Sequence, residues 1–201
     1  MSGDAHIHIV DADDKARDSL SLLLCAAGYS VCAHPNARAF VDNFEQREKC
    51  CVVADAQMPE LSGIELLAAM RARGALTPVI VVAANPNVRL AVEIMKQGAF
   101  DFLRKPFSGH AMLASIRAAL TRDDVKGPPD ARARMIQQRF AALSAREKRL
   151  LDGLLKGLPN KFIAYQLGVS VRTVEIHRAR LMAKTQAKSI AELVKMALIA
   201  L

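Results

Sequence analysis

The segment 51–66, CVVADAQMPELSGIEL, constrains the fold more than any other part of the chain. It begins with a short apolar run that is typical of a buried parallel strand, and this run ends at Asp55. The residues at 57–59 then turn the chain, and Gly63 begins an amphipathic run that is typical of a helix. Because open α/β sheets place their chemistry at the carboxyl ends of their strands, the sequence predicts that Asp55 lies at a functional site.

The first 122 residues alternate short apolar runs with amphipathic runs. This alternation predicts an α/β domain with a doubly wound, five-stranded parallel sheet. The predicted strands are 6–10, 29–33, 51–54, 79–83 and 100–103. The predicted helices are 15–27, 36–48, 64–73, 88–97 and 108–120.

A polar segment, TRDDVKGPPD at 121–130, separates this part from the rest of the chain. Its glycine and two prolines cannot continue a helix, so we place a domain boundary there. The sequence therefore predicts a first domain at 1–122, a partly helical linker at 123–141 and an all-α, four-helix second domain at 142–201. The expected helices are 131–143 at the entry to this domain, then 146–156, 160–167, 171–185 and 190–201.

The net positive charge lies entirely beyond residue 122. Residues 1–122 contain 13 Lys and Arg and 13 Asp and Glu, whereas residues 123–201 contain 15 and 7. This asymmetry indicates a polyanionic partner for the second domain. The pair 160–167 and 171–185, joined by a turn at Gly168, has the helix-turn-helix pattern, which makes double-stranded DNA the expected polyanion.

The N-terminal region has no basic segment followed by an apolar one, and no apolar stretch reaches 18 residues. We therefore expect a cytoplasmic protein with no membrane partner. The four cysteines, Cys25, Cys32, Cys50 and Cys51, form no CxxC motif, and no histidine cluster accompanies them at zinc spacing. We interpret them as small buried apolar residues in a reducing compartment; a redox switch at Cys50 and Cys51 is the alternative.

Residues 5–120 resemble the receiver domains of response regulators. The motifs that carry this resemblance are DxxMPxxxGxELL at 55–67 and KPF at 105–107. Aspartyl phosphorylation requires an acceptor carboxylate, a divalent cation held by carboxylates and a positive charge for the phosphoryl oxygens. The resemblance implies these roles for Asp55 as phosphoacceptor, Asp11 as the second carboxylate and Lys105 as the positive charge, with Phe102 in the position of the switch aromatic.

Two positions depart from the receiver pattern. The first strand of a receiver usually ends in two acidic residues, but here the second is Ala12; the fourth usually ends in Thr or Ser, but here it ends in Ala83. Asp13 and Asp14 follow Ala12 and either replace the missing magnesium ligand or cap the next helix. With Asp11 and Asp55 as the remaining ligands, we expect a weak Mg²⁺ site or none.

The two departures predict a degenerate receiver whose output is independent of phosphorylation or depends on it weakly. The first alternative is a conventional phosphorelay regulator, phosphorylated on Asp55 by a sensor histidine kinase. A second alternative is a receiver that sequesters a partner protein. The DxD at 11–13 also resembles the nucleophile motif of haloacid-dehalogenase-type phosphatases, but Lys15 replaces their usual Thr or Val, and we expect no enzyme activity.

The segment 143–201 resembles the LuxR/FixJ-type helix-turn-helix domain. The matching sequences are LSAREKRLL, GLPNKFIAYQLGVSVRTVEIHRARLMAK and AKSIAELVKMAL. In the predicted helix 171–185, Val174 and Leu181 fall on the side that packs in the core, and His177 lies at its edge. The residues expected to face the bases are Arg172, Glu175, Ile176 and Ala179, of which Arg172 reaches either a guanine or a phosphate. The expected phosphate contacts are Asn160, Lys161, Thr173, Arg180 and Lys184.

The last predicted helix is unusually apolar. Its apolar residues are Ile190, Leu193, Val194, Ala197, Leu198 and Leu201. We interpret this excess as a homodimer contact, which would imply a two-fold symmetric operator, or alternatively as a helix that only closes the core. The predicted function is a DNA-binding transcription regulator, with a sensor histidine kinase or another regulatory protein as a further partner.

Overall fold

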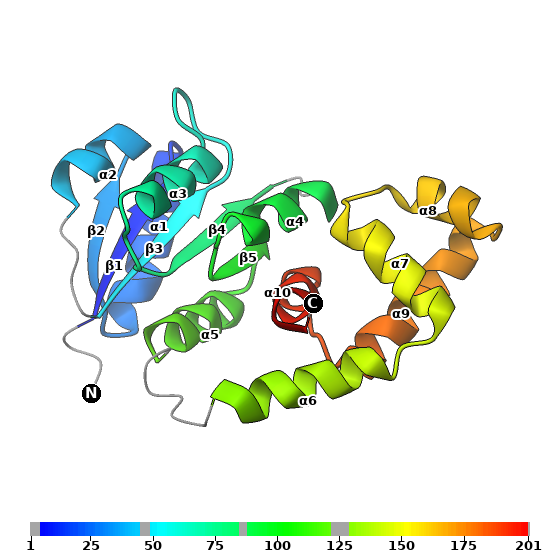
Figure 1. Cartoon of the computed structure of the whole chain (residues 1–201). Helices are drawn as coiled ribbons and strands as arrows, with labels where there is room; N and C mark the ends of the chain where they lie inside the picture. The colour runs from blue at the N-terminus through cyan, green and yellow to red at the C-terminus, as the bar shows by residue number, and fades with distance from the viewer. Residues whose placement is uncertain (1–4, 45–48, 85–87, 122–128, 201) are drawn as a thin grey trace. The chain divides into compact units, whose positions relative to one another are not determined.

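The computed structural model describes residues 5–44, 49–84, 88–121 and 129–200 (Figure 1). The chain forms two compact units. The first comprises Met1–Asn85 and Gln97–Val125, and the second comprises Pro86–Lys96 and Lys126–Leu201. The structure therefore assigns 86–96 to the second unit, whereas the sequence placed this segment within a first domain at 1–122. In the parts of the chain that the structure describes, no helix is long and apolar enough to cross a membrane.

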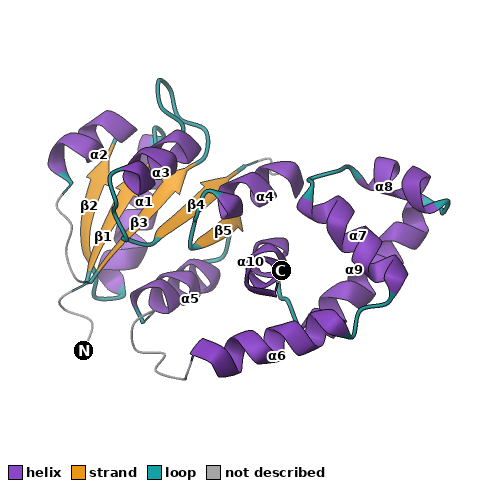
Figure 2. Ribbon diagram, viewed as in Figure 1, coloured by secondary structure: helices purple, strands orange, loops and turns teal. Residues whose placement is uncertain are grey.

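The first unit contains a five-stranded parallel sheet in the order β2-β1-β3-β4-β5 (Figure 2). Its strands are β1 (His6–Val10), β2 (Ser30–His34), β3 (Cys50–Asp55), β4 (Val79–Ala83) and β5 (Asp101–Arg104). The predicted doubly wound sheet is confirmed, with ends that differ by at most one residue. The chain order reverses between β1 and β3, which is the switch point where such sheets place their sites.

Helices α1 (Asp14–Ala26), α2 (Ala37–Asn43), α3 (Gly63–Ala72) and α5 (Gly109–Leu120) accompany the sheet, and α4 (Val88–Lys96) connects β4 to β5. Alternate residues of β1 point to opposite faces. Ile7 and Ile9 join the core that α1 and α5 cover, through residues such as Leu24 and Met112, whereas His8 contacts Phe40 of α2 on the other face. The predicted helix 36–48 is too long: α2 ends at Asn43, where Phe44 has an extended backbone, and residues 45–48 lie outside the described residues.

Gly63 explains why the segment 51–66 is so constraining. A Cβ atom at this position would collide with the backbone carbonyl oxygen of Asp55. Only glycine therefore allows α3 to begin directly against the end of β3. Ser62 caps this helix, with its hydroxyl accepting from the Glu65 amide while the Glu65 carboxylate accepts from the Ser62 amide.

The second unit is helical. Besides α4, it contains α6 (Pro129–Ala141), α7 (Ala145–Leu155), α8 (Asn160–Leu167), α9 (Val171–Thr185) and α10 (Ile190–Ala200). The predicted bounds of α8 and α9 are confirmed. The core of this unit includes Ile136, Phe140, Leu150, Leu154, Ile163, Val174, Leu181, Leu193 and Ala197.

Helix α6 differs from the sequence prediction in two ways. It begins at Pro129, two residues before the expected start; a proline fits the first helical position because the amide there has no partner inside the helix. It also contributes Ile136 and Phe140 to the core of the second unit, although the sequence placed both in a linker at 123–141. Their spacing of four residues puts both side chains on one face of α6.

Candidate functional site

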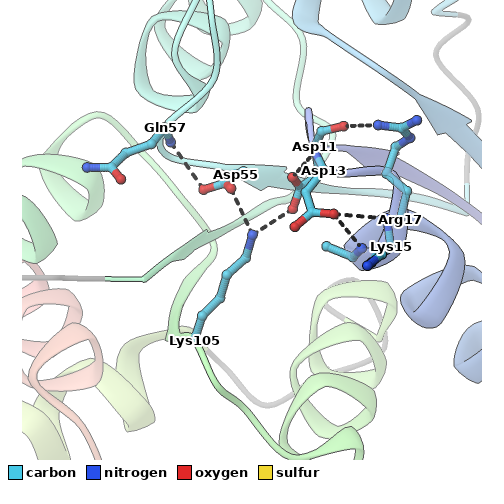
Figure 3. A network of polar contacts seen from close by, with 8 residues as sticks. Asp11, Asp13, Lys15, Arg17, Asp55, Gln57 and Lys105 are labelled. Carbon is cyan, nitrogen blue, oxygen red and sulfur yellow. Dashed lines mark hydrogen bonds and ion pairs between the residues drawn. The ribbon is translucent and has the colours of Figure 1, made fainter.

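An acidic pocket forms where β1 and β3 end side by side. Val10 pairs with Ala54, so Asp11 and Asp55 follow at the same level of the sheet. Both carboxylates bind the ammonium of Lys105, which follows β5: the Nζ–Oδ2 distances are 2.6 Å to Asp11 and 2.8 Å to Asp55 (Figure 3). The backbone amide of Gln57 donates to Oδ1 of Asp55 at 3.1 Å. The structure thus brings together the three residues that the sequence singled out for this site.

In the acidic pocket a single ammonium, that of Lys105, faces two carboxylates. Burial alone would lower the pKa of Lys105, but its hydrogen bonds to Asp11 and Asp55 and their negative charges outweigh this effect and raise the pKa above its ordinary value. Lys105 therefore carries its full charge at neutral pH and shares it between two carboxylates. A new anion or cation at this site has to compete with that arrangement.

The structure uses Asp13 and Asp14 elsewhere. Asp13 caps α1, because its Oδ1 accepts from the amides of Lys15 at 2.9 Å and Ala16 at 3.2 Å. Asp14 is exposed and forms an ion pair with Arg17. Of the two roles that the sequence left open for these residues, the structure places Asp13 in the capping role and Asp14 in an ion pair on the first turn of α1.

Arg17 is a residue of this pocket that the sequence analysis missed. Its Nη1 donates to the backbone carbonyl of Asp11 at 2.7 Å, and its side chain is largely buried. The guanidinium therefore lies beside the end of β1, and its positive charge is paired with the Asp14 carboxylate. Its place three residues after Asp14 is a spacing that favours an ion pair, but no local pattern indicates the contact with the Asp11 carbonyl.

Ala83 is almost completely buried at the end of β4. Its carbonyl accepts from the Lys105 amide at 2.8 Å, so its backbone lies next to the pocket. The side chain at this position is a methyl group, which can neither donate nor accept a hydrogen bond. Phe102 lies in β5 opposite Val81 and is partly buried.

Magnesium fits this pocket only in part. Mg²⁺ is commonly held by one or two carboxylates plus water, and Asp11 and Asp55 supply that minimum set. Both carboxylates, however, already bind Lys105, and the third acidic position is Ala12. The ammonium uses only Oδ2 of each carboxylate, and each Oδ1 accepts a single backbone amide, so an entering ion would share the two carboxylates with Lys105.

Helix α9 presents the second candidate site. Val174 and Leu181 are fully buried, as predicted, and His177 lies at the edge of the core. The opposite side of the helix faces solvent with Arg172, Glu175, Ile176, Ala179 and Arg180. A solvent-facing helix that combines arginines, a carboxylate and an apolar side chain has the chemistry for reading base edges in a major groove.

The turn before α9 is defined by two residues. Gly168 ends α8 in the left-handed conformation, with a φ of 64° that favours glycine. Ser170 then caps α9: its hydroxyl accepts from the Thr173 amide at 3.1 Å and lies 2.8 Å from the Thr173 hydroxyl. Thr173 is thus held against the cap, which leaves its hydroxyl partly engaged.

Lys184 is positioned differently from the sequence expectation. Its ammonium donates to Oε2 of Glu147 at 2.8 Å, whereas we expected it to contact DNA phosphates. Glu147 also accepts from the Ser144 amide at 2.8 Å, and these contacts, with Lys184 contributing most, lower its pKa to about 2. The ion pair between Lys184 and Glu147 thus connects the end of α9 to the first turn of α7.

Helix α8 contributes the remaining expected contacts. Lys161 is exposed and Asn160 partly exposed at its start, where the helix dipole favours an anion. The same helix also exposes Phe162 and Tyr165, the latter by 84%, which the sequence analysis did not single out.

Helix α10 exposes less apolar surface than the sequence suggested. Leu193, Val194 and Ala197 are buried, and Leu198 and Ile199 are exposed. Leu201 lies outside the described residues.

The cysteine prediction was wrong for two of the four residues. Cys25 and Cys32 are exposed, because they lie on the outer side of α1 and on the edge strand β2. Cys50 and Cys51 are buried as expected. Burial and the neighbouring Cys50 raise the pKa of the Cys51 thiol, which disfavours the reactive thiolate that a redox switch needs.

The two parts of the chain that contain these sites match known protein families. Residues 7–117 match the response regulator receiver domain, and residues 141–197 match the bacterial regulatory proteins of the luxR family. The chain belongs to the response regulators with a LuxR-type DNA-binding domain. It is a transcription regulator of this two-component class.

Similar proteins support this assignment along the whole chain. The transcriptional regulatory protein FixJ of Azorhizobium caulinodans is 46% identical over 96% of this chain and 92% of its own. FixJ of Bradyrhizobium diazoefficiens is 42% identical over 98% of this chain and 97% of its own. Among solved structures, full-length FixJ from B. japonicum has a TM-score of 0.57 and 41% identity, covering 99% of this chain and 98% of that one.

Proposed function

We propose that this response regulator binds DNA with an affinity that depends weakly, or not at all, on phosphorylation of Asp55. The observation that carries the proposal is the pairing inside the acidic pocket. Lys105 binds both Asp11 and Asp55, while Ala12 and Ala83 supply neither a third carboxylate nor a hydroxyl.

The loss of the hydroxyl matters because a ligand shifts a conformational equilibrium only by its differential affinity for the two states. A phosphoryl group on Asp55 would meet a buried methyl group at Ala83. No hydrogen bond can form there, so a movement of the end of β4 toward the phosphoryl group would add little binding free energy. Lys105 already lies beside Asp55 before any phosphoryl group arrives, which further reduces the difference between the two states.

Magnesium has a limited part in this proposal. Asp11 and Asp55 would hold the ion, which would neutralise charge on a transferring phosphoryl group when bound. Lys105 already binds both carboxylates and Ala12 supplies no third one, so we propose a weak site.

The DNA-binding surface is proposed to comprise the exposed side of α9 and the start of α8. On α9, Arg172, Glu175, Ile176 and Ala179 face bases, and Arg180 and Thr173 face phosphates; Asn160 and Lys161 add phosphate contacts from α8. Lys184 contributes to phosphate binding only when it leaves Glu147. A homodimer on a two-fold operator is proposed from the exposed Leu198 and Ile199 on α10.

The test compares four samples of the full chain on a DNA site selected by this protein from a random pool. Wild type and Asp55→Ala are each measured with and without Mg²⁺ plus beryllofluoride, which mimics an aspartyl phosphate. We expect affinities equal within about twofold in all four samples. A tenfold gain that requires beryllofluoride and disappears in Asp55→Ala would overturn the proposal and favour the conventional phosphorelay regulator driven by a histidine kinase.

The sequestering alternative predicts a different result. If the receiver is mainly a binding module for a partner protein, the intact wild-type chain selects no preferred DNA sequence under any of these conditions. Selection of a defined site by the unmodified chain therefore excludes this alternative and supports a direct regulator.

A further inference from the structure

Three potential metal ligands converge on β1 and β2, outside the acidic pocket. His8 comes from the middle of β1, and Cys32 and His34 come from β2. Each residue offers one donor atom: a ring nitrogen from His8, a ring nitrogen from His34 and the Sγ of Cys32. These three atoms lie within 4.8 Å of one another. The sequence analysis missed this group because its members are separated by 24 and 2 residues, which matches no zinc spacing.

The sheet register explains why they meet. His8 pairs directly with Cys32 across the parallel strands, and His34 lies two residues further along β2. Residues two apart on a strand point to the same face, so all three side chains project on the side of α2. Nδ1 of His8 lies 3.0 Å from Nε2 of His34, and the two rings stack with centroids 5.3 Å apart.

The surroundings suit a site that is shielded on one side and open on the other. His8 and His34 are buried, and the rings of Phe40 and Phe44 lie against them at steep angles or edge-on. Cys32 is exposed, because β2 is an edge strand of the sheet. A small ion can therefore reach the thiol from solvent and meet the two imidazoles behind it.

The protonation state also suits metal binding. Burial lowers the pKa of His34, and a hydrogen bond between its ring and the Ala39 backbone opposes this effect only in part. The ring is therefore neutral at physiological pH, which is the form that binds metal ions. A second hydrogen bond that orients a ligating ring is a regular feature of zinc sites.

We propose that His8, Cys32 and His34 bind one Zn²⁺ ion, with water in the fourth position. Tetrahedral zinc with nitrogen and thiolate ligands requires donor atoms about 3.3–3.7 Å apart, so the two nitrogens separate slightly and Cys32 moves inward. The hydrogen bond between Nδ1 of His8 and Nε2 of His34 breaks, and the proton that lay between them moves to the other nitrogen of its own ring, so that each imidazole keeps one N–H on the nitrogen that does not bind the ion. Cys32 loses its thiol proton to solvent, so binding releases one proton.

The donor set selects against the ion expected at the acidic pocket. Mg²⁺ prefers oxygen ligands and binds imidazole and thiolate poorly, whereas Zn²⁺ accepts both. Excess Mg²⁺ therefore covers the carboxylates of Asp11 and Asp55 without competing at the three-ligand group. This difference allows the zinc site to be measured in the full chain.

The experiment uses tag-free, fully reduced protein in excess Mg²⁺. Zn²⁺ affinity is measured by competition with a chromophoric chelator, and Co²⁺ replaces Zn²⁺ to report thiolate ligation by its charge-transfer absorption. We expect one ion per chain and a thiolate-to-cobalt band in wild type. Cys32→Ser should weaken binding at least tenfold and abolish the band.

Cys25→Ser is the matched control, because Cys25 is the other exposed cysteine and lies on α1. It should keep the wild-type affinity and the band. Since Cys32 is exposed, its replacement by serine leaves the core intact, and an unchanged Tm without metal checks this. Failure of wild type to bind stoichiometrically, or equal affinity in Cys32→Ser, would overturn the proposal and leave His8 and His34 as a packed pair.

Discussion

The acidic pocket and the exposed side of α9 both carry charged side chains, but these are buried and paired in the pocket and exposed to solvent on α9. In the pocket, Asp11 and Asp55 are mostly buried and share one ammonium. On α9, Arg172, Glu175 and Arg180 face solvent. A site whose charges are already paired responds weakly to a new ion, whereas a site that exposes them is ready to bind one.

The difference follows from where the backbone places each group. Strand ends at the switch point of the sheet bring carboxylates into a poorly solvated space, where an unpaired charge is costly and a partner is required. A surface helix leaves its charges in water, where pairing contributes little. Removing one charge from each region should therefore have very different consequences.

The largest effect is expected for Lys105→Ala. The substitution leaves Asp11 and Asp55 close together without a cation, and we expect the free energy of unfolding at pH 7 to fall by about 3 kcal/mol. Urea denaturation of the full chain measures this loss. Added Mg²⁺ should recover part of it, because a divalent ion can take the place of the ammonium.

Lys49→Ala is the matched control, since Lys49 is exposed just before β3. It should change the free energy of unfolding by less than about 0.5 kcal/mol. If Lys105→Ala were equally mild, the pocket would be better solvated than its burial indicates, and the comparison with α9 would lose its basis.

In the DNA-binding domain, Lys161→Ala and Glu175→Ala should have different effects on DNA binding. Loss of a phosphate contact at Lys161 should weaken binding to all DNA, by about tenfold, and reduce the salt dependence by roughly one ion. Glu175→Ala should instead change which bases are preferred at one position of the site. Binding titrations on selected and scrambled DNA at several salt concentrations distinguish the two.

Lys156→Ala provides the reference for this pair, because Lys156 is an exposed lysine that already pairs with Asp152 on α7. Its loss should leave both affinity and preference nearly unchanged. If Lys161→Ala altered base preference while Glu175→Ala weakened binding uniformly, the assigned roles would have to be exchanged.

A smaller effect is expected where Glu147 joins α7 to α9. Its pKa of about 2 lies below the ordinary 4.5, so its stabilising contribution is complete above pH 4.5 and is lost as the pH falls toward 2. Glu147→Gln should lower the free energy of unfolding by about 1 kcal/mol at pH 7. The difference in the free energy of unfolding between wild type and Glu147→Gln should shrink as the pH falls below 4.5, which denaturation at a series of acid pH values measures. A difference that persists at pH 2 would contradict the role given to the Glu147 carboxylate.

The sequence predicted the fold well because the strongest signals were local. The apolar runs gave β1 and β4 their ends, and Gly168 and Ser170 marked the end of α8 and the start of α9. The convergence of Asp11, Asp55 and Lys105 was also predictable, since parallel strands bring their carboxyl ends to one edge. The strand ends needed only periodicity, whereas the roles of Asp11, Asp55 and Lys105 also rested on the resemblance to receiver domains.

What the sequence did not predict depends on contacts between distant residues. Lys184 was expected to face DNA, because nothing local indicated that Glu147, 37 residues earlier, would hold it. The group of His8, Cys32 and His34 depends on the register between β1 and β2, which no spacing rule contains. Arg17 was overlooked for a different reason: besides its ion pair with Asp14 it donates to the Asp11 backbone carbonyl, and no side-chain pattern indicates a carbonyl partner.

The smallest expected effect is the most informative for the pocket. Asp13→Asn keeps a side chain that caps α1 equally well but removes a carboxylate, so Mg²⁺ affinity should not change if Asp13 only caps the helix. Ala12→Asp is the matched opposite: Ala12 is exposed, and a carboxylate there should tighten Mg²⁺ binding about tenfold by adding a hard oxygen ligand. Calorimetric titration with Mg²⁺ compares both with wild type. A clear loss in Asp13→Asn would mean that the cap opens to bind the ion, and the pocket would then resemble α9 in having a charge available for a ligand.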